Sequence, residues 1–204
     1  WTPVNSGLPE NVSVNCLVVS GKNLFAGTYE DGIFLSTNDG KSWTAVNSGL
    51  PEDVSVNCLV VSGTNLFAAT DAGVFLSKHN GASWTAVNLG LTDKTVECLA
   101  VKETNLFAGT VGNGVFLSTN NGKNWTAVNT GLTGKGISCL TASATKLFAG
   151  TCEVDDFEPF NFPHDPLHIG AGVFLTEDEG GTWTAVNSGL PEYTSVKCLA
   201  VSGT

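Results

Sequence analysis

The sequence predicts an all-β fold built from a repeated unit of about 41 residues, and three observations support this prediction. Tryptophan recurs at near-constant spacing, and cysteine recurs in step with it. Each unit contains four short runs rich in Val, Leu, Phe and Thr, bounded by Gly, Asn, Ser and Asp, which is typical of strands joined by turns. No unit has the i, i+3, i+4 apolar stripe of a helical repeat. The recurring residues are Trp1, Trp43, Trp84, Trp125 and Trp183, with Cys16, Cys58, Cys98, Cys139 and Cys198.

Four strands in a period of this length are typical of a β-propeller blade, a small antiparallel sheet stacked on its neighbours around an axis. In the second unit we expect strands A to D at residues 56–61, 65–70, 73–77 and 83–88. Consecutive apolar residues in strand A indicate burial on both faces, which places it inside the ring. The alternating polar residues of strand D place it at the outer edge.

The chain contains four complete units, at about residues 14–47, 56–88, 96–129 and 137–187. Residues 1–5 form an isolated D strand and residues 195–202 an isolated A strand, which gives a split partial fifth blade without strands B and C. We therefore treat residues 1–204 as a single propeller domain and expect the natural protein to be longer. Another subunit at these open edges is the alternative, since unpaired edges recruit partners.

One unit departs from the pattern. Its Trp spacing grows by about 17 residues, which predicts an insertion at residues 152–169, inside the fourth complete blade. The insertion replaces a short B–C turn, and long loops of this kind are often functional.

The turn between strands C and D carries a second signature, seen in "STNDGKSW" (36–43), "SKHNGASW" (77–84), "STNNGKNW" (118–125) and "TEDEGGTW" (176–183). These segments resemble the Asp-box (BNR-like) repeat of sialidase-like propellers and of photosystem II assembly factors. Only the last has Asp, at Asp178, in the acidic position; Asn38, His79 and Asn120 replace it elsewhere. The resemblance implies the fold and implies nothing about activity.

The composition excludes several functions. A net charge of -10 opposes binding to nucleic acid, and no run of about 20 apolar residues could span a bilayer. Arginine is absent, so the arginine cluster that the resemblance to sialidases would imply has no counterpart, nor has the basic surface associated with the assembly factors.

Antiparallel strands place the A–B and C–D turns on one face of the ring and the B–C and D–A loops, with the insertion, on the other. Acidic residues recur on this second face and predict a rim that attracts cations, with simple solvation as the alternative. They are Glu10, Asp31, Glu52, Asp71, Asp93 and Glu192.

The insertion itself allows three interpretations. A metal site would use Asp155, Asp156, His164 and His168, with Ca²⁺ favoured by the carboxylates and a transition metal by the imidazoles. A glycosidase would need a spaced pair of its carboxyl groups. A recognition loop would present aromatic anchors among prolines, and for this we select ligand-binding residues Phe157, Glu158, Phe160, Phe162, His164, Asp165 and His168.

We predict a non-catalytic binding or structural module that is secreted or at the cell surface. It would recognise a protein or glycan through the face that carries the insertion, with no cofactor or with Ca²⁺. A carbohydrate-active protein, either a lectin or a glycosidase other than a sialidase, is the first alternative. The second is a homo-oligomer or fibre that pairs through the open terminal half-blades.

Overall fold

The computed structural model describes residues 2–152 and 171–202, and it arranges them as four antiparallel sheets of four strands each. Strands A are β1 (Val14–Ser20), β5 (Val56–Ser62), β9 (Val96–Lys102) and β13 (Gly136–Ala142). Strands B are β2 (Asn23–Thr28), β6 (Asn65–Thr70), β10 (Asn105–Thr110) and β14 (Leu147–Cys152). Strands C are β3 (Ile33–Ser36), β7 (Gly73–Ser77), β11 (Val115–Ser118) and β15 (Val173–Thr176). Strands D are β4 (Thr44–Ala45), β8 (Thr85–Ala86), β12 (Thr126–Ala127) and β16 (Thr184–Ala185).

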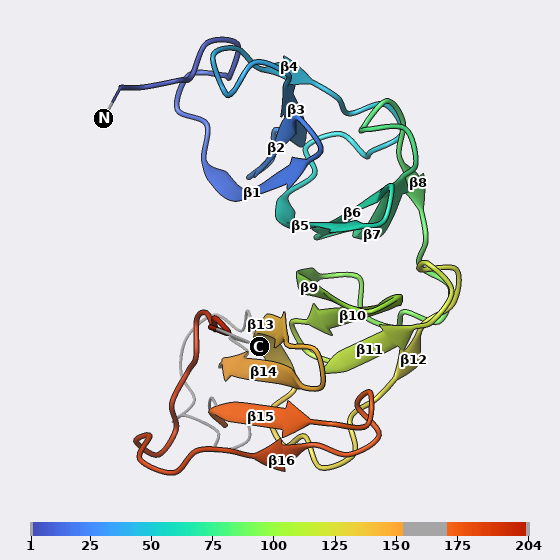
Figure 1. Cartoon of the computed structure of the whole chain (residues 1–204), viewed down its shortest axis with the longest axis vertical. Coiled ribbons are helices and arrows are strands. Elements are labelled where there is room, and N and C mark those ends of the chain that lie inside the picture. The colour runs from blue at the N-terminus through green and yellow to red at the C-terminus, as the bar shows by residue number, and fades with distance from the viewer. Residues whose placement is uncertain (1, 153–170, 203–204) are drawn as a thin grey trace, which may run out of the picture.

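The four sheets stack as successive blades of an open crescent (Figure 1). Within each sheet the strands follow the order A, B, C, D, and β1 contacts β5, β5 contacts β9 and β9 contacts β13. The A strands therefore line the inner side of the crescent, as the sequence predicts. The all-β propeller architecture is confirmed.

Strand D is shorter than predicted. The sequence predicts residues 83–88 for the second blade, whereas β8 covers only Thr85–Ala86. The asparagine side chain that follows takes over the pairing, because Asn88 Oδ1 accepts a hydrogen bond from Val74 N at 2.7 Å. A side chain therefore replaces part of the backbone ladder at the outer edge.

The hydrophobic core lies between blades. Between the second and third blades, Phe67 and Val74 of one sheet pack with Val96, Leu99 and Trp125 of the next. All five side chains are buried, and the same arrangement recurs between the first and second blades and between the third and fourth. Each blade is thus stabilised mainly by its neighbours, as in other repeat proteins.

The tryptophan of each complete blade is hydrogen-bonded to the D segment that precedes the blade. Its indole Nε1 donates to the carbonyl oxygen of the valine in the preceding D segment, at 2.7 to 2.8 Å. Burying the ring supplies apolar contact and this bond satisfies the polar N–H. The four pairs are Trp43 with Val4, Trp84 with Val46, Trp125 with Val87 and Trp183 with Val128.

The C–D turns that hold the tryptophans are fixed by short side-chain acceptors. In the fourth blade, Thr182 N donates to Asp178 Oδ1 at 2.9 Å, and Gly180 N donates to Thr176 Oγ1 at 3.0 Å. Asn38 Oδ1 in the first blade accepts from Ser42 N at the same 2.9 Å. Glu179 and Gly180 both adopt positive φ, 58° and 86°, which this tight turn requires.

We expect replacement of Asp178 by Asn to leave the fold close to wild type at neutral pH and to remove part of its acid sensitivity. Hydrogen bonds from Thr176 and Thr182 lower the pKa of Asp178 from 3.8 to about 2. The native carboxylate therefore contributes stability above pH 3.8, and this contribution is lost as the pH falls toward 2. Denaturant unfolding across this range measures the difference, with Asp178→Ala as the variant that loses the acceptor. An unchanged acid profile in Asp178→Asn would contradict the assignment.

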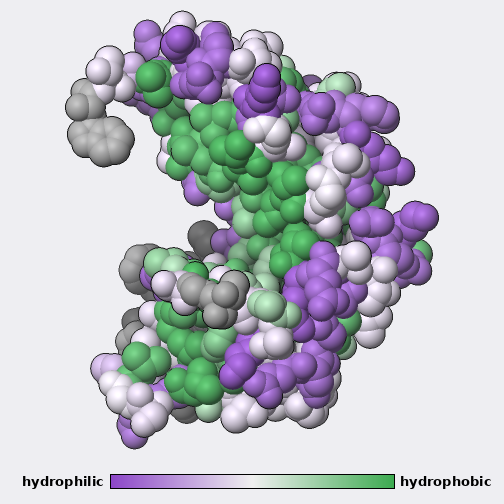
Figure 2. All heavy atoms as spheres, viewed as in Figure 1, coloured by the Kyte–Doolittle hydropathy of each residue, from purple (hydrophilic) through white to green (hydrophobic). Residues whose placement is uncertain are grey.

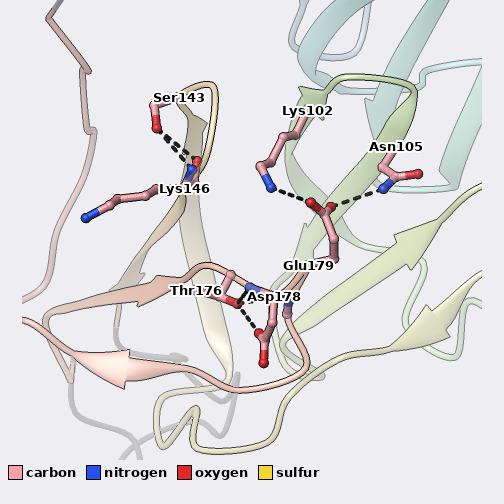
Figure 3. Close-up of polar contacts among 8 residues, drawn as sticks. Lys102, Asn105, Ser143, Lys146, Thr176, Asp178 and Glu179 are labelled. Atoms are coloured by element: carbon pink, nitrogen blue, oxygen red, sulfur yellow. Dashed lines mark hydrogen bonds and ion pairs between the residues drawn. The ribbon is translucent and has the colours of Figure 1, made fainter. Parts of the chain in front are cut away.

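A charged pair joins the third and fourth blades on the same face as these turns (Figure 3). Lys102, which is buried at the end of β9, contacts the Glu179 carboxylate, and Asn105 Nδ2 donates to Glu179 Oε2 at 3.1 Å. Lys102 and Asn105 flank an A–B turn, whereas Glu179 lies in a C–D turn. Their contact confirms that the two kinds of turn share one face.

The cysteines of the A strands are structural thiols. Cys16, Cys58, Cys98 and Cys139 are free and wholly or partly buried, and burial raises the pKa of each thiol. Cys98 Sγ lies 3.8 Å from the Ile137 carbonyl oxygen of the next blade. The repeat-equivalent cysteines therefore act as small buried residues and form no disulfides with one another.

We expect the native protein to react with a maleimide at the exposed Cys198 and to protect Cys98 until it unfolds. Stability should also fall above pH 9, because unfolded thiols ionise near 9.0 while burial raises the pKa of Cys16 to about 12. The unfolded state then holds fewer protons than the native state, so the free energy of unfolding decreases as the pH rises toward 12. Mass spectrometry of labelled peptides and denaturation at pH 8 and 10 test both parts; equal labelling of Cys98 and Cys198 would contradict the first.

Candidate functional site

The residues that the sequence analysis selects in the insertion lie outside the described residues. These are Asp155, Asp156, Phe157, Glu158, Phe160, Phe162, His164, Asp165 and His168. Their roles in ligand or Ca²⁺ binding stay predictions. The described part of the same face is formed by the other B–C loops and the D–A loops.

In the first three blades, a backbone hydrogen bond joins the B–C turn to the start of the A strand of the same blade. Tyr29 N donates to Ser13 O at 2.9 Å, and Val111 N donates to Thr95 O at 3.1 Å. In the second blade the equivalent bond joins Asp71 N to Ser55 O. The loop face is consequently a continuation of the sheets.

Further bonds connect the B–C turns of the first, third and fourth blades to the D–A segment that follows each blade. Glu30 N donates to Ser55 Oγ at 3.2 Å, and Gly114 N donates to Lys135 O at 2.9 Å. Gly172 N, after the insertion, donates to Thr194 O at 3.1 Å. Hydrogen bonds thus hold the loops of the first and second blades together, and those of the third and fourth blades.

Two of the acidic residues expected in the rim bind backbone amides. Asp93 Oδ1 accepts from Thr95 N at 3.0 Å and its Oδ2 accepts from Gly112 N at 2.9 Å. Asp71 Oδ1 accepts from Ser55 N at 3.3 Å. These carboxylates hold the loops in place, and their negative charge is fixed in position as a result.

Glu97 adds a further carboxylate near the inner end of this face. Its pKa is raised, first by burial and then by Asp93, while the ammonium group of Lys197 acts in the opposite direction. The equivalent positions in the other A strands are Asn15, Asn57, Ser138 and Lys197. Only the third blade and the incomplete fifth blade therefore have a charged side chain at this position of strand A.

Tyr29 is an exposed aromatic side chain on the same face. Its pKa is raised by a hydrogen bond and by the charge of Glu30, with a smaller contribution from Asp71. The phenol O–H donates to Glu30, and the exposed ring offers its face to a cationic group.

The sequence analysis did not select a set of asparagines, one in each complete blade. Each follows the valine of strand D; in the first blade Asn47 Oδ1 accepts from Ile33 N at 2.7 Å and Asn47 Nδ2 donates to Asp31 O at 3.0 Å. This clamp shapes the B–C turn that carries Tyr29. The signal was present in the sequence, because Val-Asn recurs in every unit. The other members are Asn88, Asn129 and Asn187.

Within residues 2–152 and 171–202, no group of three or more His, Cys, Asp or Glu side chains is placed to hold a metal ion. No helix in this described part could cross a membrane. The described portion of the acidic loop face presents carboxylates together with the exposed ring of Tyr29.

The model of the DUF6242 beta propeller domain matches this chain over residues 1–88 and 36–147. The chain belongs to this family. A comparison with curated proteins gave no match.

Solved structures show how this DUF6242 propeller domain relates to other proteins. An extracellular domain of B. thetaiotaomicron, from a protein described as a one component system, is 19% identical with a TM-score of 0.65; the alignment covers 94% of this chain and 24% of that one. YCF48 bound to D1 peptide is 16% identical with a TM-score of 0.58, covering 88% of this chain and 70% of that one. A GH74 enzyme of Niastella koreensis is 18% identical with a TM-score of 0.57, covering 84% and 25% respectively.

These similarities show the fold alone, since all lie below 25% identity. The chain spans about a quarter of the length of the B. thetaiotaomicron domain. Propellers of this kind include both enzymes and non-enzymes, so the family by itself leaves the question of catalysis open.

Proposed function

We propose that this DUF6242 propeller domain is a non-catalytic, extracellular protein-binding module whose acidic loop face receives a cationic segment of its partner. The observation that carries the proposal is the loop face of the first three blades, whose B–C turns are held to the starts of their A strands by hydrogen bonds. It holds Tyr29 beside Glu30 and Asp71, and it fixes the Asp93 carboxylate through two backbone amides.

The net charge of -10 and the absence of arginine give this surface a long-range attraction for cations. Charges already held in place by hydrogen bonds need little reorganisation when a partner binds, which reduces the entropic cost of association. The similarity to an extracellular domain supports the location, and the similarity to a propeller bound to a peptide supports the class of partner.

The proposal is tested with a lysine-rich peptide and fluorescence anisotropy at low and physiological salt. We expect binding that weakens as salt rises, because exposed charges are screened. Asp31→Lys, on the loop face, should weaken binding about tenfold, corresponding to the loss of roughly one close charge pair.

Glu177→Lys is the matched control, since it makes the same change of charge on the opposite face, where Glu177 pairs with Lys146 at 3.1 Å. Equal weakening by both variants would indicate attraction by net charge alone and would contradict a binding face. Turnover in a glycan hydrolysis screen would contradict the non-catalytic assignment.

A further inference from the structure

Each complete blade has a β-bulge at the same place near the start of its A strand. In β5 the pairing with strand B passes from Val56 directly to Cys58, so Asn57 is left out of the ladder. A bulge of this kind turns the extra residue and re-aims its side chain. The extra residues of the four blades are Asn15, Asn57, Glu97 and Ser138.

In three of these blades the bulged side chain donates a hydrogen bond to the next repeat unit. The acceptor is the backbone carbonyl oxygen at an equivalent place each time, and the bond from Asn57 Nδ2 to Val96 O is 2.9 Å long. We call such a bond a clasp, because it joins adjacent units at the inner side of the crescent. The clasps are Asn15 with Val56, Asn57 with Val96 and Ser138 with Val196.

The bulged residue of the third blade is Glu97, and among the described residues it forms no clasp. The carbonyl oxygen equivalent to that of Val96 belongs here to Ile137 of the fourth blade. An ionised carboxylate only accepts hydrogen bonds, and so does a carbonyl oxygen. The charged form of Glu97 is therefore unable to close the contact that an asparagine closes in the first two blades.

The thiol beside Glu97 contacts the acceptor that lacks its clasp. Cys58 Sγ lies 3.9 Å from Leu99 O, whereas Cys98 Sγ lies 3.8 Å from Ile137 O and not beside Leu140, the equivalent of Leu99. A thiol is a weak donor. The Ile137 carbonyl oxygen thus receives a weaker bond than the amide of Asn57 gives to its own acceptor.

We propose that Glu97 is a proton-controlled clasp between the third and fourth blades. A protonated carboxyl group has an O–H that donates to the Ile137 carbonyl oxygen, as the amide N–H of Asn57 donates one blade earlier. Serine and asparagine both span this gap, so the longer glutamate side chain reaches it by a change of rotamer. Because residues 152–169 belong to the fourth blade, the proton controls how firmly the blade with the insertion is joined to the third.

The surroundings of Glu97 favour its protonated form. Burial raises the pKa of this carboxyl group above its ordinary 4.5, Asp93 raises it further, and the ammonium group of Lys197 acts against both. Figure 2 shows apolar surface along the inner side of the crescent, where the A strands lie. The other titratable groups around this contact are thiols whose pKa values are raised by burial: Cys98, with Cys58 of β5 and Cys139 of β13 near it.

Glu97 makes its contribution to stability in acid. The folded protein holds the Glu97 proton more tightly than the unfolded chain, in which the pKa is near 4.5. The contribution is therefore fully present below pH 4.5 and is lost as the pH rises through the folded-state pKa. This dependence is opposite to that of Asp178. The inference concerns a contact between blades and is independent of the proposed function.

The first test follows both partners of the bond by NMR between about pH 3.5 and 8, with carbon-13 in glutamate carboxyl and isoleucine carbonyl groups. The isoleucines are Ile33, Ile137 and Ile169. We expect Glu97 to titrate with a midpoint above 4.5, and the Ile137 carbonyl signal to move downfield with the same midpoint as the pH falls. Glu97→Asn should hold the Ile137 signal near its acidic position at every pH.

The second test compares two substitutions by denaturant unfolding. Glu97→Asn supplies a permanent donor, whereas Glu97→Leu removes the charge and supplies none. For a folded-state pKa one pH unit above the unfolded value, Glu97→Asn should raise the folding equilibrium constant about tenfold at neutral pH and have little effect near pH 4. Glu97→Leu should raise it less at neutral pH and lower it near pH 4, where it removes a formed bond.

Glu52→Asn is the matched control, because it removes the same charge from an exposed position on the same loop face. It should change the folding equilibrium constant less than about twofold at either pH. Circular dichroism verifies that each variant folds. A Glu97 midpoint at or below 4.5, an Ile137 signal that does not follow it, or an equal gain from Glu97→Leu and Glu97→Asn at neutral pH would each overturn the proposal.

Discussion

Replacing Gly90 by alanine is expected to destabilise the protein by about 3 to 5 kcal/mol, through overpacking combined with backbone strain. Gly90 has φ of 87°, and a Cβ there would overlap the backbone carbonyl oxygen of Trp125. Neither cost can be relieved by a side-chain rotation, because the obstacle is backbone. The carbonyl belongs to the turn that anchors the third blade, so any shift disturbs the core between the second and third blades.

Gly189→Ala is the matched control, because Gly189 has φ of 89° and open space around it. It should cost only the conformational strain, about 1 to 2 kcal/mol. Urea unfolding of both variants measures the difference, which isolates the steric overlap. Equal free energies of unfolding would contradict the close approach of the Gly90 loop to Trp125.

Replacing Trp125 by alanine is expected to cost about 3 to 5 kcal/mol, the range for removing a buried aromatic side chain from a core. The ring is buried between the second and third blades with Leu91 and Val96, and its Nε1 donates to Val87 O at 2.7 Å. The substitution therefore removes both the apolar contact and the hydrogen bond from the interface between the second and third blades.

Trp125→Phe separates the two contributions, because it retains much of the apolar contact and removes the hydrogen bond. We expect it to cost less than half as much as alanine. Trp43→Ala should also cost less, since among the described residues the cluster around Trp43 has Ala26 and Phe34 as its other buried members. Denaturant unfolding of the three variants gives the order, and an equal cost for Trp43→Ala and Trp125→Ala would contradict blade-to-blade stabilisation.

The sequence predicts best the strands whose pattern recurs in every repeat unit. The bounds predicted for strands B and C of the second blade, 65–70 and 73–77, agree with β6 and β7. Strand D was predicted too long because Val87 makes the last backbone bond, to Val74 O, and the Asn88 side chain then replaces the backbone acceptor. Residue patterns do not distinguish a side-chain acceptor from a backbone acceptor.

The loop face was predicted less completely. Its acidic character follows from the sequence, but the use of Asp93 to bind two amides depends on how close Thr95 and Gly112 come in space. Residues 195–202 were expected to form a strand, yet they lie against the fourth blade without a strand assignment. An isolated A strand has no neighbouring B strand to complete its ladder, so its environment decides its conformation.

The sequence by itself determined the all-β class, the four-stranded unit, the inner position of strand A and the face that each loop occupies. These properties depend on spacing and polarity, which are local and repeat along the chain. Only the tertiary structure revealed the buried Lys102 beside Glu179 and the asparagine clamps. Those features arise because a repeated sequence places nearly identical side chains in unequal surroundings, and the surroundings are set by which blade lies next to them.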